Sequence, residues 1–282
     1  MDLSLAEQLA TIFKTEYLYL PSAEKISALQ GQWYLDSYRT SVVTWLQQIS
    51  CILELDEQTL SLACNLCDRM LCVQRFDASK ILHLAQSCLL LAAKLTETEI
   101  PSVFEFVEVC RLGDSQSIVE MESFVLRVLN WKVSSSCTAI HVARLLARLL
   151  GMNLKAYALK KVYSEIRRLE ASSMHVGIPS SSLGIETFLS VLLNGFSLVC
   201  ASDVRAIESA LKECGVEFCA DSVAGLHVNR ALRTDNCASQ AKRRKIEQKI
   251  PDIDNSGCRN DEFDSRSESN CDSPVSIRFG SN

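Results

Sequence analysis

Apolar side chains recur every three to four positions through much of this chain, the spacing that places them on one face of an α-helix. Between residues 38 and 131 the period runs through five segments, which begin near positions 38, 56, 77, 101 and 115. Asp56 suits the N-cap of the second segment, and Pro101 suits the first helical position of the fourth. The third segment, which begins at Asp77, is apolar on nearly all sides. We therefore expect it to be a central helix enclosed by the others.

A second set of helical segments follows the first. We place its helices at about 137–150, 155–174, 181–196 and 202–215, with a fifth near 220–232. Before both sets, residues 1–36 contain one or two amphipathic helices, which must pack against something. Their apolar positions are Leu5, Leu9, Ile12 and Phe13, then Ile26, Leu29 and Trp33.

These segments predict an all-α fold with two consecutive bundles of about five helices each. The low content of turn-forming residues, 10 Gly and 5 Pro in 282 residues, favours helices over a β fold. The expected divisions are an N-terminal helical segment (1–36), a first bundle (37–135), a second bundle (136–232) and a tail (233–282). Ser, Asn, Asp and Arg dominate the tail, which is typical of disorder.

Charge and hydropathy exclude several classes of partner. A net charge of −5 gives no electrostatic basis for broad nucleic-acid binding. No apolar run reaches the roughly 18 residues that a spanning helix needs, and the first residues carry acids instead of a basic signal region. We therefore expect neither a membrane nor a nucleic acid as a direct partner.

Candidate catalytic chemistry is sparse. The 13 cysteines form no framework of pairs, which is typical of reduced intracellular thiols. Cys64 and Cys67 form a C-x-x-C on the apolar face of a predicted helix, and because no second pair completes a zinc site, we assign them to core packing. The 4 histidines are scattered singly, and there is no glycine-rich phosphate loop. We expect no enzyme activity, no cofactor and no metal.

Two charges in apolar helical stretches stand apart from this pattern. Glu122 has only apolar neighbours at helical spacing, namely Ile118, Val119, Val125 and Leu126. Lys94 ends the run HLAQSCLLLAAK. Because a charge beside buried apolar surface is costly unless something pairs with it, the partner of each lies either elsewhere in the fold or on another protein. Two simpler interpretations stay open: Lys94 complements a helix C-terminus, and Glu122 points to solvent.

Four stretches carry a resemblance to a known family. YRTSVVTWLQQI, TLSLACNLCDRML, KILHLAQSCLLLAAKL and IVEMESFVLRVLNWKV resemble successive helices of a cyclin box, in the family's order and spacing. The resemblance covers about residues 30–135, and the second bundle is similar only in outline, as a degenerate cyclin-like bundle. TLSLACNLCDRML and the tail stretch AKRRKIEQKIPDID are most similar to G- and I-type cyclins.

The resemblance gives Lys94 and Glu122 a role. In cyclins the residues at these positions point toward the small lobe of a cyclin-dependent kinase, where the lysine donates to backbone groups beside the mobile C-helix and the glutamate accepts from them. This contact holds the kinase C-helix in its active position, so the resemblance implies a regulatory subunit without chemistry of its own. Leu95 and Leu126 would supply the apolar surface around the pair, and Glu97 would meet kinase arginines.

The resemblance also implies a structural ion pair. Arg39 and Asp68 are charges of opposite sign on apolar helix faces. Family members pair the residues at these positions inside the first bundle, which would lock its first helix to its second. Removing one partner of a buried pair costs about 3–5 kcal/mol.

One departure from the family affects substrate docking. Many cell-cycle cyclins begin their first helix with Met-Arg-Ala-Ile-Leu, an apolar patch that docks substrate motifs. Here Ser41 replaces a large aliphatic residue ahead of Val42, and Leu82 stands where the groove usually has glutamine. We expect the usual docking motif to bind poorly. Tyr38 and Trp45 either shape a different groove or are a surface and a core residue.

The tail carries two candidate signals. Lys242, Arg243, Arg244 and Lys245 form a basic run suited to a nuclear-import receptor, from which we expect the protein in nucleus and cytoplasm. Ser273, which precedes Pro274, is a candidate phosphorylation site.

Two other uses of the fold compete with kinase regulation. The first is a non-activating adaptor that recruits a phosphatase or another partner. The second is DNA binding, as in general transcription factors of this fold, but it requires a basic face that residues 1–232 do not offer.

Overall fold

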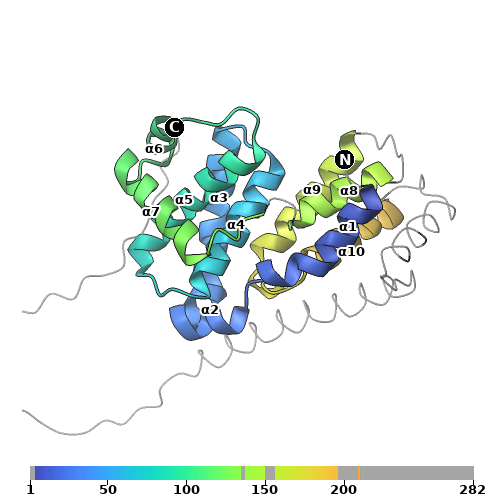
Figure 1. Ribbon diagram of the computed structural model, residues 1–282, viewed down its shortest axis with the longest axis horizontal. Coiled ribbons are helices and arrows are strands. Elements are labelled where there is room, and N and C mark those ends of the chain that lie inside the picture. The colour runs from blue at the N-terminus through green and yellow to red at the C-terminus, as the bar shows by residue number, and fades with distance from the viewer. Residues whose placement is uncertain (1–3, 135–136, 150–155, 196–208, 210–211, 213–282) are drawn as a thin grey trace, which may run out of the picture. The chain divides into compact units, whose positions relative to one another are not determined.

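The computed structural model describes residues 4–134, 137–149 and 156–195, together with residues 209 and 212. Every regular element of these residues is a helix, so the prediction of an all-α fold is confirmed (Figure 1). In chain order the α-helices are α1 (Leu5–Thr15), α2 (Ala23–Gln30), α3 (Arg39–Ile52), α4 (Glu57–Leu71), α5 (Ala78–Thr96), α6 (Val103–Cys110), α7 (Ser115–Val128), α8 (Ala139–Leu149), α9 (Ala156–Ala171) and α10 (Ser180–Gly195). Short turns of 3-10 or π helix occupy Glu16–Tyr19, Tyr34–Tyr38 and Ser173–His175.

Helix α5 is the centre of the first core. All of its side chains from Leu84 to Ala93 are buried, and α4 and α7 pack against it. The predicted central helix is therefore confirmed. Cys64 and Cys67 lie in the same core, where burial raises the pKa of the Cys64 thiol well above its usual value. Their placement agrees with a packing role.

The starts of the helices follow local capping chemistry, with one correction. Asp56 caps α4, accepting a hydrogen bond of 2.8 Å from the backbone N–H of Gln58. The prediction that Pro101 is the first residue of the fourth segment's helix, α6, was wrong. Ser102 caps this helix, which begins at Val103. The Ser102 hydroxyl accepts from the N–H of Glu105, whose carboxylate accepts in return from the N–H of Ser102. This reciprocal pair satisfies the helix end and places Pro101 one residue before the cap.

A second core joins α8, α9 and α10 with the first helix of the chain. Leu9 and Ile12 of α1 are buried in it, and α1 lies beside α8 (Figure 1). Ile26 of α2 is instead buried in the first core. The N-terminal segment therefore packs against both cores. Trp33 was predicted to lie on the apolar face of an N-terminal helix. This prediction was wrong, since Trp33 lies beyond the end of α2 and its side chain is exposed.

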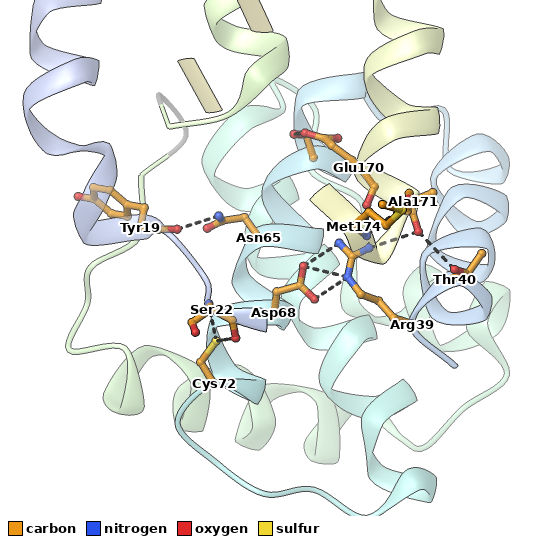
Figure 2. Close-up of polar contacts among 12 residues, drawn as sticks. Tyr19, Ser22, Arg39, Thr40, Asn65, Asp68, Cys72, Glu170, Ala171 and Met174 are labelled. Carbon is orange, nitrogen blue, oxygen red and sulfur yellow. Dashed lines mark hydrogen bonds and ion pairs between the residues drawn. The ribbon is translucent and has the colours of Figure 1, made fainter. Parts of the chain in front are cut away.

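The connection between α1 and α2 is fixed along α4. The side-chain amide of Asn65 donates to the carbonyl of Tyr19 at 2.9 Å, and the N–H of Ser22 donates to the thiol of Cys72 at 3.1 Å (Figure 2). These bonds satisfy backbone groups that would otherwise lie unpaired at the surface of α4.

Several predictions lie outside the described residues. These are most of the helix predicted at 202–215, the one near 220–232, and the tail from residue 233. Among the described residues, no helix combines the length and the hydropathy required to cross a bilayer.

Candidate functional site

Lys94 and Glu122 form an ion pair between two helices of the first core. Lys94 lies in the last turn of α5 and Glu122 in the middle of α7, and the lysine Nζ lies 2.8 and 2.7 Å from the two carboxylate oxygens. The Glu122 side chain is 10% exposed and that of Lys94 is 37% exposed. Each charge therefore has its partner within the fold. The interpretation of Glu122 as a solvated residue was wrong.

Apolar side chains border this pair at the surface. Leu95 follows Lys94 and is 41% exposed, and Val119, one turn before Glu122 on α7, is 40% exposed. Leu126, one turn after Glu122, is half-buried against the first core. An ammonium group thus protrudes beside exposed aliphatic surface, an arrangement suited to contact with another protein.

Glu97 is engaged within the chain. Its Oε1 accepts a hydrogen bond of 2.7 Å from the backbone N–H of Asp56 and another from the hydroxyl of Thr59. Both donors belong to the start of α4, so the carboxylate ties the end of α5 to that helix. The sequence had assigned Glu97 to kinase arginines and gave no indication of this tie.

Arg39 lies at the junction between the two cores. Its Nε and Nη2 donate to the carboxylate of Asp68 at 3.0 and 2.8 Å, and its Nη1 donates to the carbonyl of Glu170 at 2.8 Å and to that of Ala171 at 3.3 Å (Figure 2). Both charged side chains are almost fully buried. Arg39 therefore joins the start of α3 to α4 and also satisfies carbonyls at the C-terminal end of α9.

Further polar contacts continue this junction along α4. The Asp56 carboxylate accepts from Arg144 of α8 at 2.7 Å, and Glu57 pairs with Arg167 of α9 at 3.0 Å. One turn on, the Ser61 hydroxyl donates to the Glu170 carboxylate at 2.5 Å. The start of α4 thus binds both α8 and α9 through contacts that the sequence did not predict.

Comparison with known proteins places these features in a family. The sequence pattern of the family described as Cyclin, N-terminal domain, matches residues 7–134, which run from within α1 to beyond the end of α7 and include the Lys94–Glu122 pair. The chain therefore contains a cyclin N-terminal domain, which makes up just under half of its length.

Individual relatives agree with that match. Cyclin-D1-1 of Arabidopsis thaliana is 31% identical over 134 residues, which cover 46% of this chain and 40% of that protein. G1/S-specific cyclin-D1 of Danio rerio is 26% identical over 235 residues, 82% of this chain and 68% of the relative. Both are D-type cyclins by name, so the nearer resemblance to G- and I-type cyclins stays a prediction.

A solved structure supports the cyclin fold. The X-ray structure of a viral cyclin from herpesvirus saimiri superposes with a TM-score of 0.59 over 74% of this chain and 97% of that chain, at 16% sequence identity. The alignment extends beyond the family match, so the predicted cyclin fold is confirmed.

Most of the residues expected to form a substrate groove pack against the first core instead. Val42 is buried, while Tyr38, Trp45 and Leu82 are half-buried against the first core. The Tyr38 hydroxyl donates to the carbonyl of Ala78 at 3.1 Å, which ties α3 to α5. Only Ser41 of the five is exposed. Poor binding of the usual motif stays a prediction.

The two tail signals lie outside the described residues. The structure therefore gives no placement for the basic run of Lys242, Arg243, Arg244 and Lys245, nor for Ser273. Nuclear import and phosphorylation stay proposals.

The junction predicts a pH dependence of stability. Burial raises the pKa of the Glu170 carboxyl from 4.5 to about 7, although the hydrogen bond from Ser61 and the charge of Arg39 lower it. The folded state therefore binds more protons than the unfolded state between about pH 4.5 and 7. The stability contributed by the protonated carboxyl is fully present below about pH 4.5 and is lost as the pH rises to about 7.

Glu170→Gln tests this dependence. The glutamine oxygen still accepts from Ser61, so the variant should unfold at a higher temperature than the unchanged protein at pH 8, with a smaller difference at pH 5. Thermal unfolding at both values measures it, and Glu165→Gln on the same helix is the control. An identical pH dependence in the Glu170→Gln variant and the unchanged protein would show that this carboxyl does not titrate in the window.

Proposed function

We propose that this protein is the regulatory subunit of a cyclin-dependent kinase and holds the kinase C-helix in its active position. The observation that carries the proposal is the Lys94–Glu122 pair, which reaches the surface beside exposed Leu95 and Val119. The cyclin N-terminal domain supports a regulatory role without catalysis, and the pair supplies the polar groups that main-chain recognition requires.

The pair suits recognition of another protein's backbone. A lysine ammonium has three donor hydrogens, and two carboxylate oxygens have about four acceptor positions. The bonds between Lys94 and Glu122 use only part of this capacity. The remaining carboxylate positions of Glu122 can accept from a peptide N–H, and the remaining ammonium hydrogens of Lys94 can donate to a peptide C=O; such charge-assisted bonds are the stronger ones.

Because Lys94 and Glu122 already bind each other in the free protein, binding a partner costs less side-chain entropy. A cyclin that binds only the kinase conformation with its C-helix inward shifts the population toward that conformation. Activation therefore needs no chemistry from the cyclin.

The test is capture followed by an activity measurement. Purified full-length protein is offered to a panel of cyclin-dependent kinases, and each complex that forms is assayed for phosphorylation of a model substrate. We expect at least one kinase to bind and to gain activity on binding. A complex with a phosphatase and no kinase would contradict the proposal and support the adaptor alternative, as would a kinase that binds without gaining activity.

A further inference from the structure

The end of α5 is held by a contact that differs from ordinary helix capping. Helix α5 ends at Thr96, and Glu97 is its C-cap, with its backbone N–H bonded to the carbonyl of Ala93 at 2.9 Å. The Glu97 side chain then crosses to α4, where it accepts from the N–H of Asp56 and the hydroxyl of Thr59. We call Glu97, Asp56 and Thr59 the Glu97 clasp.

The clasp is built from groups that favour a negative charge. A carboxylate at the N-terminus of a helix interacts with unpaired N–H groups and with the positive end of the helix dipole. Thr59 is fully buried, so its hydroxyl has little access to water that would compete for Glu97. Asp56 is itself restrained, because its carboxylate binds Arg144 through both oxygens at 2.7 Å. The clasp therefore attaches α5 to a fixed point.

The clasp lies close in sequence to the proposed binding pair. Glu97 follows Lys94 by three residues, less than one helical turn. The last turn of a helix has unsatisfied carbonyls and frays unless it is held. Since Glu122 is fixed within α7, movement of the last turn of α5 displaces Lys94 relative to Glu122. Small displacements of positioned groups weaken recognition strongly.

We propose that Glu97 and Thr59 are positioning residues for kinase binding: they hold the last turn of α5 so that Lys94 meets Glu122 in one geometry. Glu97 then acts through Lys94 and makes no contact with kinase arginines. This inference rests on the proposed function and assigns Glu97 a different role from the one the sequence suggested.

Substitutions separate positioning from a direct charge contact. Glu97→Gln removes the charge but keeps an acceptor oxygen for Asp56 and Thr59, whereas Glu97→Ala removes both. Thr59→Val removes one donor of the clasp at a buried position that no partner reaches, and Thr59→Ser keeps the donor. The matched control is Thr187→Val in α10, because the buried Thr187 hydroxyl has no hydrogen-bond partner among the residues that the structure describes.

Two measurements are made on each full-length variant. The first is amide hydrogen exchange of residues 92–96 in the isolated protein, and the second is the dissociation constant for the kinase found by the capture experiment. Positioning predicts faster exchange and about tenfold weaker binding for Thr59→Val and Glu97→Ala, the equivalent of one hydrogen bond to a charged group. Glu97→Gln, Thr59→Ser and Thr187→Val should each stay within about threefold of the unchanged protein in both measurements.

Several results would overturn the inference. If Glu97→Gln binds as weakly as Glu97→Ala while Thr59→Val binds normally, Glu97 contacts the kinase through its charge. Unchanged exchange of residues 92–96 in Thr59→Val would show that the clasp does not hold the helix end. If the unchanged protein binds no kinase, the proposed function fails, and exchange alone then decides whether the clasp holds α5.

Discussion

Replacing Arg39 by methionine should lower the free energy of unfolding by about 3–5 kcal/mol, the cost of leaving a buried charge without its partner. The substitution leaves the carboxylate of Asp68, which is nearly inaccessible to water, without a cationic partner. It also removes the donor that satisfies the carbonyls of Glu170 and Ala171 at the end of α9. Urea unfolding, followed by circular dichroism, measures the loss.

Two further variants show whether burial is the cause. Arg168→Met breaks an exposed pair with Glu165 within α9 and should change stability by less than about 1 kcal/mol. Arg39→Met combined with Asp68→Leu removes both buried charges and should recover much of the loss. A similar loss in Arg39→Met and Arg168→Met would mean that the position of Arg39 at the junction is not important for stability.

The second large effect concerns kinase binding. Lys94→Met combined with Glu122→Gln should weaken binding by about 100-fold or more, since it removes charge from two hydrogen-bonding groups worth about 1.5–3 kcal/mol each. The double substitution retains the volume of both side chains. It also avoids leaving the largely buried Glu122 carboxylate without a cation, which would confuse loss of binding with loss of stability.

Sequence reasoning located the first bundle because its signals are local. The apolar period of α5 requires burial on nearly all sides, and every side chain of the observed helix from Leu84 to Ala93 is buried. Asp56 was recognised as a cap because the hydrogen bond that it accepts comes from Gln58, only two residues away. Pro101 was misplaced because Ser102 and Glu105 form a stronger local motif that was overlooked.

The contacts that connect distant parts of the chain could not be predicted in this way. Nothing near Leu9 or Ile12 indicates that α1 is buried against helices more than a hundred residues later. The sequence around Arg144 and Glu170 did not indicate their roles, because their partners, Asp56 and Ser61, lie 88 and 109 residues away in the chain. That Lys94 and Glu122 pair with each other was not predicted either: the sequence left open whether the partner of each lies in the fold or on another protein, since periodicity describes one helix at a time and not which helices adjoin.

The most direct test of the central claim compares two pairs of charges. The dissociation constant of the captured kinase is measured for the unchanged protein, for Lys94→Met/Glu122→Gln, and for a control, Glu165→Gln/Arg168→Met, which neutralises an exposed pair on α9. The account predicts a loss of about 100-fold for the first variant and less than about twofold for the control. Equal affinity of all three proteins, each shown by thermal unfolding to be folded, would contradict it.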